Sequence, residues 1–510
     1  MADNVNKKRS VYNLLFSAFG QIVTIAFGVI LPKLFIVSFG SEVNGLLSSV
    51  TQAFVYVNLL EAGVGTATLQ ALYGPIARKE QQNVNQILAA THRYYKKAGT
   101  WYLLAVIVLS IGYPLAVKSE LDFVTVAAVV FLSGIGGVIN FFFQGKYRLI
   151  LQAEGRGYIV TNLTTVTYVA TSILKIVLIT AGFNVIFVQA MFFLTSLLQM
   201  LYIAFYIKRH YKWIDLKVKP DYDAISQKNS VLIHQVSTLI FNNTDVLILT
   251  LFCDLKVVSV YTMYRTILGV ISTFMETIGG SVQFALGQIY NVDKARYTRL
   301  HDAYETCNIT LLFALYSIAY IFILPFLRVY TAGVEDISYI DKYLPILFTA
   351  TFLLSGGRFA ANAVITFAGH FRKTQWRSLL ESSVNLTVSL VAVHYLGIYG
   401  VLIGTVCALL YRTNDMIIYS NRVILNRSPW RSYRRWLLNL LLLFATVFAA
   451  SFLHPNLDGY LHIVLYAALY TAVIVPLFFI VSLATEPAVF KTVTELVLPK
   501  VKSRLKKSTE

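Results

Sequence analysis

The sequence is poor in charged residues. Only 13 % of its 510 residues are Asp, Glu, Lys or Arg, whereas soluble globular domains carry roughly 25 %. Apolar residues make up 57 % of the chain, and its mean hydropathy is +0.64. This balance excludes an ordinary soluble domain and indicates an integral membrane protein.

The sequence also lacks the residues that would build a disulfide framework, a metal site or a nucleotide site. Its three cysteines, Cys253, Cys307 and Cys407, form no CxxC pair, so we expect free thiols packed as small apolar groups. No GxxxxGK[ST] motif is present, so this chain is not expected to hydrolyse ATP. We therefore predict no metal, no cofactor and no enzymatic activity.

Long apolar runs follow one another along almost the whole chain. A hydrocarbon core about 30 Å thick needs roughly 20 apolar residues for each helical crossing. About fourteen such runs occur, at 11–38, 44–72, 86–116, 121–145, 158–181, 184–207, 224–251, 257–286, 299–327, 343–368, 374–396, 398–421, 434–453 and 459–484. The runs are continuous, whereas barrel strands would alternate every second residue, so the predicted fold class is all-α and polytopic.

The lysines and arginines predict the orientation. With a cytoplasmic N-terminus, 34 of the 43 fall in cytoplasmic segments, which is the usual bias of membrane proteins. We therefore expect a multi-pass protein of the cytoplasmic membrane with both termini inside. The first apolar run has full span length and no small-residue cleavage site, so it is not a signal peptide. The same bias and contact with anionic lipids account for the net charge of +18. The charge therefore does not indicate nucleic acid as a partner.

An internal repeat predicts the domain organisation. A shift of about 213 residues superimposes the turn FGSEV on FCDLK, and Gly74 on Gly287. Two six-span lobes, 1–218 and 219–427, are followed by two additional spans and a basic tail at 428–510. Both lobes have the same orientation, so we expect a pseudo-twofold axis along the membrane normal, as in transporters built from parallel repeats.

Polar residues recur on one face of several predicted spans. Span 224–251 holds Asn242, Asn243, Thr244 and Asp245 consecutively among apolar residues. Residues three or four apart share a helix face, so these groups belong to a polar stripe that begins at Ser230. Similar stripes occur at 13–24, 44–61 and 265–276. Lipid would leave such groups unsatisfied, so we expect them to line a hydrated cavity between the lobes.

Nine ionisable residues lie within the predicted spans: Lys33, Glu61, Lys175, Asp245, Arg265, Arg358, Glu381, Arg412 and Asp415. Each costs about 2.5–3.5 kcal/mol at the bilayer centre, so each needs a partner or a purpose. Some have simple structural interpretations. Lys33 and Lys175 lie near outer span ends and can snorkel, while Arg412 and Asp415, one turn apart, can form a pair.

The deep arginines favour an anionic substrate. Arg265 and Arg358 lie too far from either predicted span end for easy snorkelling. Arginine offers a rigid fork of donors that matches phosphate oxygens. We therefore expect Arg265 and Arg358, with Lys33 second, to bind phosphate, and Asn242, Asn243 and Gln52 to contact sugar.

Asp245 and Glu61 have two open roles. They either neutralise these cations, with Arg265 as a candidate partner of Asp245, or couple transport to a proton or sodium gradient.

Three segments resemble the Wzx-type oligosaccharide flippases of the multidrug/oligosaccharidyl-lipid/polysaccharide exporter superfamily. They are GSEVNGLLSSVTQAFVYVNLLEAGVGTATLQALYGPIARKEQQNVNQI, NNTDVLILTLFCDLKVVSVYTMYRTI and SLLESSVNLTVSLVAVHYLGIYGVLIGT. The resemblance extends over essentially the whole chain in span count and repeat. It implies transfer of an undecaprenyl-diphosphate-linked oligosaccharide from the inner to the outer leaflet for surface polysaccharide synthesis.

The resemblance leaves related functions open. Polysaccharide polymerase or assembly proteins are possible partners, and a lipid II flippase or a multidrug antiporter of the same superfamily is the alternative. A glycan polymerase is disfavoured, because the longest predicted outside loop, at 328–342, is too short to form a domain.

Overall fold

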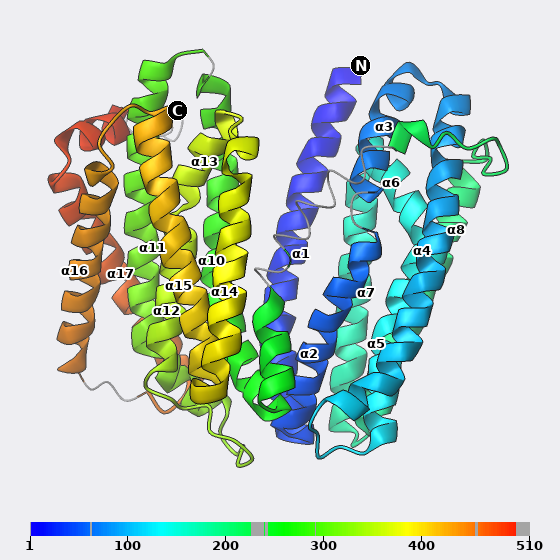
Figure 1. Ribbon diagram of the computed structural model, residues 1–510, viewed down its shortest axis with the longest axis horizontal. Coiled ribbons are helices and arrows are strands. Elements are labelled where there is room, and N and C mark those ends of the chain that lie inside the picture. Colours follow the sequence, from blue (N-terminus) through cyan, green and yellow to red (C-terminus); the bar gives the residue numbers. More distant parts are fainter. Residues whose placement is uncertain are drawn as a thin grey trace, which may run out of the picture. The chain divides into compact units, whose positions relative to one another are not determined.

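A computed structural model describes residues 2–61, 64–225, 239, 243–290, 292–453 and 457–495 (Figure 1). All regular secondary structure in these residues is helical, and 13 helices are long and apolar enough to cross a membrane. The prediction of an all-α, multi-pass membrane protein is confirmed. The expected span at 224–251 lies largely outside the described residues, and its end forms a shorter apolar helix, Asn243–Phe252.

Contacts within the chain divide it into two compact units: unit 1, Met1–Met263 with Gly333–Ile337, and unit 2, Tyr264–Ala332 with Ser338–Glu510. Helix α10 (Leu255–Tyr290) begins in unit 1 and continues into unit 2. The lobe boundaries expected from the sequence repeat, at 218 and 427, stay predictions.

Unit 1 is a bundle in which α1 packs against α2 and α7, and α5 packs against α4 and α8. Its helices are α1 (Ala2–Phe39), α2 (Ser41–Val57), η1 (Asn58–Leu60), α3 (Val64–Arg78), α4 (Gln81–Ala116), α5 (Phe123–Ile139), the π-helix η2 (Asn140–Gln144), α6 (Gly145–Ala153), α7 (Gly157–Thr180), α8 (Val185–His210) and η3 (Asp223–Ile225).

Unit 2 is a second bundle, in which α11 packs against α12, α16 and α17, and α14 packs along α15. Its helices after α10 are α11 (Lys294–Tyr330), α12 (Leu344–Gly357), α13 (Phe359–Phe367), α14 (Phe371–Leu396), α15 (Ile398–Tyr419), the π-helix η4 (Ser420–Ile424), α16 (Trp430–Ser451) and α17 (Tyr460–Ala484). The two additional spans expected at 434–453 and 459–484 correspond to α16 and α17.

Two of the predicted spans are interrupted helices. The run at 44–72 ends its first helix at Leu60, and α3 starts at Val64, so Glu61 lies at a break. The run at 343–368 is divided between α12 and α13 at Arg358. Hydropathy alone does not reveal such breaks, because the apolar run continues through both. Each break places an ionisable residue where backbone groups are not all used by helix hydrogen bonds.

Close helix packing in unit 1 depends on Gly45. A Cβ atom at this position would collide with the carbonyl oxygen of Leu255, so α2 can approach the start of α10 only without a side chain there. Polar contacts reinforce the approach: Asn44 donates to Ser259 at 2.7 Å, and the Ser49 and Thr250 hydroxyls are 2.5 Å apart. These contacts explain why the segment 243–263 belongs to unit 1.

The loop before α12 is fixed by Asp341, outside the candidate spans. Its carboxylate accepts hydrogen bonds from the backbone N–H groups of Tyr343 and Leu344, at 2.7 and 2.9 Å, and from the Tyr399 hydroxyl. Burial acts to raise the pKa of Asp341, but these hydrogen bonds outweigh it and hold the pKa below its usual value.

Candidate functional site

Unit 1 contains a cavity of about 510 Å³ lined by both apolar and polar side chains. Residues of α1, α2, η1, α4, α5, α7 and α8 contribute to it. Hydroxyl and amide groups dominate its polar lining: Thr51, Asn58, Tyr102, Ser133, Thr164, Thr167, Tyr168, Thr171, Ser172, Gln189, Thr195, Ser196 and Gln199. A cavity of this kind within a membrane span can hold a hydrated or polyhydroxylated ligand.

Lys175 of α7 contributes the charge of this cavity. Its ammonium donates to the Gln189 side-chain oxygen at 3.0 Å, and the Gln189 amide donates to the Ser133 hydroxyl at 2.8 Å. The sequence suggested snorkelling for Lys175, but its side chain is turned to α8 within the bundle. The cavity was not predicted, although the hydroxyls of Thr164, Thr167 and Thr171 recur along α7 at a helical spacing that the sequence reveals.

Glu61, predicted for ion coupling or charge pairing, is held by a phenol. The Tyr95 hydroxyl of α4 donates to its carboxylate at 2.5 Å, and the Arg148 guanidinium of α6 attracts it electrostatically. Arg148 is one of the 34 cations that the predicted orientation assigns to cytoplasmic segments. Glu61 therefore has a protein environment that can serve either predicted role.

Asp245, the second acid with these two open roles, is buried in unit 1. Its carboxylate accepts a hydrogen bond from the Tyr261 hydroxyl at 2.8 Å, and Thr244 beside it lies 2.7 Å from the Tyr56 hydroxyl. Asp245, the acid of the NNTD segment, is thus surrounded by protein and does not face lipid. Pairing with Arg265 stays a prediction.

The predicted sugar contacts are distributed within unit 1. Gln52 of α2 is half-buried, and among the described residues its side-chain oxygen has no hydrogen-bond partner. Asn243 donates to the backbone oxygen of Leu239 at 3.1 Å, and Asn242 lies outside the described residues. Lys33 is half-buried on α1. Among the predicted sugar contacts that the structure describes, Gln52 presents an unused acceptor for a ligand donor.

The predicted phosphate partners Arg265 and Arg358 belong to unit 2. Arg265 lies on α10 and is half-buried. Arg358, at the break between α12 and α13, donates to the Glu381 carboxylate at 2.5 Å, and the two side chains are only 16 % and 8 % exposed. Arg358 is thus paired within the protein, and a phosphate at this position would share its guanidinium with Glu381.

The pair belongs to a larger ionic cluster between α14 and α15, which we call the α14–α15 cluster: Arg358, Arg377, Glu381, Arg412 and Asp415. Arg412 pairs with Asp415 at 2.7 Å, which confirms the pairing expected from their spacing, and lies 3.4 Å from Glu381. The cluster holds three arginines and two carboxylates, so it keeps one positive charge within the span region.

A second ionic cluster was not predicted. Arg427 and Arg435, which the sequence analysis assigned to a cytoplasmic segment, are buried against Asp302, Glu305 and Glu486. Arg435 is only 4 % exposed and donates to all three carboxylates. These contacts join α11, the start of α16 and the residues after α17. We refer to these five residues as the α11–α16 cluster.

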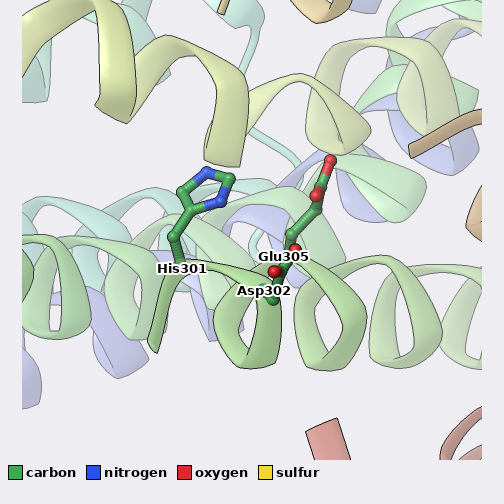
Figure 2. Close-up of side chains that lie close together, drawn as sticks. All are labelled: His301, Asp302 and Glu305. Atoms are coloured by element: carbon green, nitrogen blue, oxygen red, sulfur yellow. The ribbon is translucent and has the colours of Figure 1, made fainter. Parts of the chain in front are cut away.

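His301, Asp302 and Glu305 in this region have ligand atoms within 4.8 Å of one another, and all three project from α11 (Figure 2). Their chemistry does not suit a cation. Both carboxylates accept hydrogen bonds from arginine, and the His301 ring nitrogens lie 3.3 Å from the Ala360 carbonyl oxygen and 3.4 Å from Arg427. A metal ion would have to displace the arginine hydrogen bonds that both carboxylates already accept.

Solved structures of MATE and MurJ transporters have a similar arrangement of helices. An inward-facing multidrug resistance MATE family transporter of the MOP superfamily aligns with a TM-score of 0.63 at 18 % identity, over 78 % of this chain and 93 % of that chain. The lipid II flippase MurJ, inward closed, aligns with a TM-score of 0.68 at 13 % identity, over 92 % and 99 %.

A third similar structure is a MOP superfamily transporter from Pyrococcus furiosus, described as having a binding pocket of reverse polarity that suggests a different function. Its TM-score is 0.56 at 18 % identity, over 81 % of this chain and 95 % of that chain. No protein-family model and no curated protein matches the sequence. Likeness at such identities shows the fold, and the chain has the fold of the MOP superfamily transporters.

Proposed function

We propose that this chain is a transporter that moves an undecaprenyl-diphosphate-linked oligosaccharide from the inner to the outer leaflet of the cytoplasmic membrane. The product would serve the synthesis of a surface polysaccharide such as capsule, exopolysaccharide or O-antigen. Both termini would lie in the cytoplasm. The fold of the MOP superfamily supports a transporter, and the substrate is argued from the charges within the spans.

The observation that carries the proposal is the positive charge at two places, the unit 1 cavity and the α14–α15 cluster. The α14–α15 cluster has one more cation than carboxylates. In unit 1 the cavity has Lys175 and no Asp or Glu among its lining residues. The effective dielectric constant within a membrane span is lower than in bulk water, so cations there attract phosphate and carboxylate groups strongly. These two places therefore favour an anionic ligand over a cationic one.

The same charges suggest how a headgroup crosses. A diphosphate and its sugars cannot enter hydrocarbon without large desolvation costs. Arg265, Arg358 and Lys33 would bind the diphosphate, while Asn242, Asn243 and Gln52 would contact sugar, and the polyprenyl tail would remain in lipid. Asp245 and Glu61 would balance the cations or couple the cycle to H⁺ or Na⁺.

Two alternatives use the same fold. A lipid II flippase would recognise the same polyprenyl diphosphate, so the charges do not separate it from the first proposal. A multidrug antiporter for cationic drugs would require net acidic sites, which the α14–α15 cluster and the unit 1 cavity do not supply. The identity of the accumulated lipid distinguishes the first two functions, and drug sensitivity distinguishes the third.

The test is depletion of the protein in its host, followed by measurement of lipid-linked sugars on each leaflet. Wild type, Arg265→Gln and Arg78→Gln serve as complements, because Arg78 is an exposed arginine outside the proposed site. We expect inner-leaflet oligosaccharide lipid to accumulate on depletion, and wild type and Arg78→Gln to restore its transfer while Arg265→Gln does not.

Membrane levels of each variant are measured in parallel, so that loss of protein is not mistaken for loss of transport. Accumulation of lipid II would instead support the lipid II flippase. Unchanged lipid-linked sugars together with greater sensitivity to cationic drugs would contradict the proposal and support the antiporter.

A further inference from the structure

Lys175 differs from the buried arginines of unit 2 in having no acidic partner. Among the described residues, no carboxylate lies within 4.0 Å of its ammonium. Its contacts are the Gln189 oxygen at 3.0 Å and the ring of Phe35, whose centroid is 5.8 Å away. A neutral amide and an aromatic ring stabilise a desolvated cation only partly, so the ammonium retains a strong attraction for an anion.

Several hydroxyl groups around the cavity donate their proton to the backbone of their own helix. Ser133, Thr167, Thr195 and Ser196 each donate to the backbone oxygen four residues earlier on their own helix, at 2.6–2.7 Å. A hydroxyl has one proton and two lone pairs, so each donating group keeps acceptor capacity, although Ser133 and Thr195 use part of theirs by accepting from Gln189 and Thr171. The cavity therefore presents hydrogen-bond acceptors to a ligand, and a fitting ligand is rich in O–H donors.

Size and aromatic content add a further constraint. A volume of about 510 Å³ lies in the usual range for small-molecule sites, which is about 300–1,000 Å³. Phe54, Tyr102, Tyr168 and Phe192 contribute aromatic surface to the same lining, on which the apolar face of a sugar ring can pack. The cavity suits part of a glycan and not a complete lipid-linked chain.

We infer that the unit 1 cavity binds an acidic carbohydrate, with Lys175 pairing with its carboxylate and the surrounding hydroxyls accepting hydrogen bonds from its O–H groups. This inference rests on the proposed function in assigning the sugar to the transported glycan. It deepens that function by naming an acidic repeat unit as the substrate class. The diphosphate could meet the same ammonium, and the experiment separates the two sources.

The experiment measures binding to the full chain in lipid nanodiscs by titration calorimetry. The probes are cellobiouronic acid, an acidic disaccharide, then cellobiose, its neutral counterpart, and inorganic pyrophosphate. Lys175→Met removes the charge and keeps an apolar stem, Lys175→Gln keeps a hydrogen-bonding group, and Lys175→Arg keeps the charge. Lys118→Met removes an exposed cation and serves as the matched control.

We expect the acidic disaccharide to bind wild type and the Lys118→Met variant equally. Lys175→Met and Lys175→Gln should weaken its binding about tenfold to a hundredfold, as expected for loss of a charged hydrogen bond. Lys175→Arg should retain most of the affinity. Cellobiose should bind more weakly and equally to all variants, and pyrophosphate should not displace the acidic sugar.

Three results would overturn the inference. The first is equal binding of the acidic sugar in the wild type and both neutral variants. The second is absence of binding by the wild type. The third is tight binding of pyrophosphate alone, which would assign Lys175 to the diphosphate.

Failure of the flippase proposal looks different. Binding would depend on Lys175 as expected, yet depletion of the protein in its host would leave lipid-linked sugars unchanged.

Discussion

The charge balance of the α14–α15 cluster predicts that substitution of Glu381 destabilises the protein more than substitution of Arg358. Glu381 is 8 % exposed and forms ion pairs with Arg358 at 2.5 Å and with Arg412 at 3.4 Å. Glu381→Gln would leave three arginines facing one carboxylate, with two positive charges in excess. Arg358→Gln would leave two arginines and two carboxylates, which balance.

The magnitudes follow from what each change leaves behind. Glu381→Gln strands buried positive charge, which typically costs about 3–5 kcal/mol of unfolding free energy. Arg358→Gln removes one charged hydrogen bond, worth about 1.5–3 kcal/mol, while Glu381 keeps Arg412 as its neighbour. The double variant should cost less than the two single changes added together, since the two groups contact each other directly.

The assay is the unfolding free energy of the purified protein in one detergent, with leaflet transfer of lipid-linked sugar measured in the same variants. We expect Arg358→Gln to remain folded in the membrane and to lose transport, and Glu381→Gln to lose stability first. Equal or greater destabilisation by Arg358→Gln would refute the reasoning. Retained transport in that variant would remove Arg358 from the substrate site.

Three further predictions concern packing, the α11–α16 cluster and pH. Gly45→Ala should destabilise the protein by about 1–3 kcal/mol, because its Cβ would collide with a carbonyl oxygen of α10, while Gly28→Ala, with open space around it, should change stability little in the same thermal unfolding assay. Arg435→Met removes the guanidinium that three carboxylates share, which leaves Arg427 as the remaining arginine of the cluster, and should lower stability by about 3–5 kcal/mol, whereas Arg431→Gln, 60 % exposed, should cost under about 1 kcal/mol; similar losses would contradict a buried cluster. Asp341 has a pKa lowered by folding, so its carboxylate stabilises the fold above its unfolded pKa of about 3.9 and loses this effect as pH falls through the lower folded pKa; Asp341→Asn should reduce the melting temperature at pH 7, and the difference should vanish in acid.

The membrane fold could be predicted because its signal is local and strong. A span needs a continuous apolar run, and each run is visible without knowledge of its neighbours. The pairing of Arg412 with Asp415 was predictable for the same reason, since three residues along a helix place both on one face.

Interactions between helices were much harder to predict. Arg358 and Glu381 come from different helices, and nothing in their spacing identifies them as partners. Arg435 was assigned to a cytoplasmic segment, because sequence position near a span end does not reveal burial against α11. The unit 1 cavity was missed although Thr164, Thr167, Tyr168, Thr171 and Ser172 recur every three or four residues along α7, because the contributions of the other helices are scattered.

The cations of the unit 1 cavity and of the α14–α15 cluster bear on the proposed substrate, which likeness to MATE and MurJ structures alone does not identify. Those structures share the helix arrangement at 13–18 % identity. In this chain, Lys175 and the arginines of the α14–α15 cluster lie within the spans, where each charge is costly. Under the proposed function, an anionic substrate accounts for that cost.

The most direct test of the central claim is transfer of a lipid-linked oligosaccharide across a bilayer by the purified protein. A fluorescent undecaprenyl-diphosphate oligosaccharide is placed in one leaflet of protein-containing liposomes, and its exposure on the other leaflet is followed with an impermeant quencher. We predict transfer that depends on the protein, fails with Arg265→Gln, and is faster for an acidic glycan than for a neutral one. The account would be contradicted if transfer were no faster than in protein-free liposomes, even with an H⁺ or Na⁺ gradient imposed.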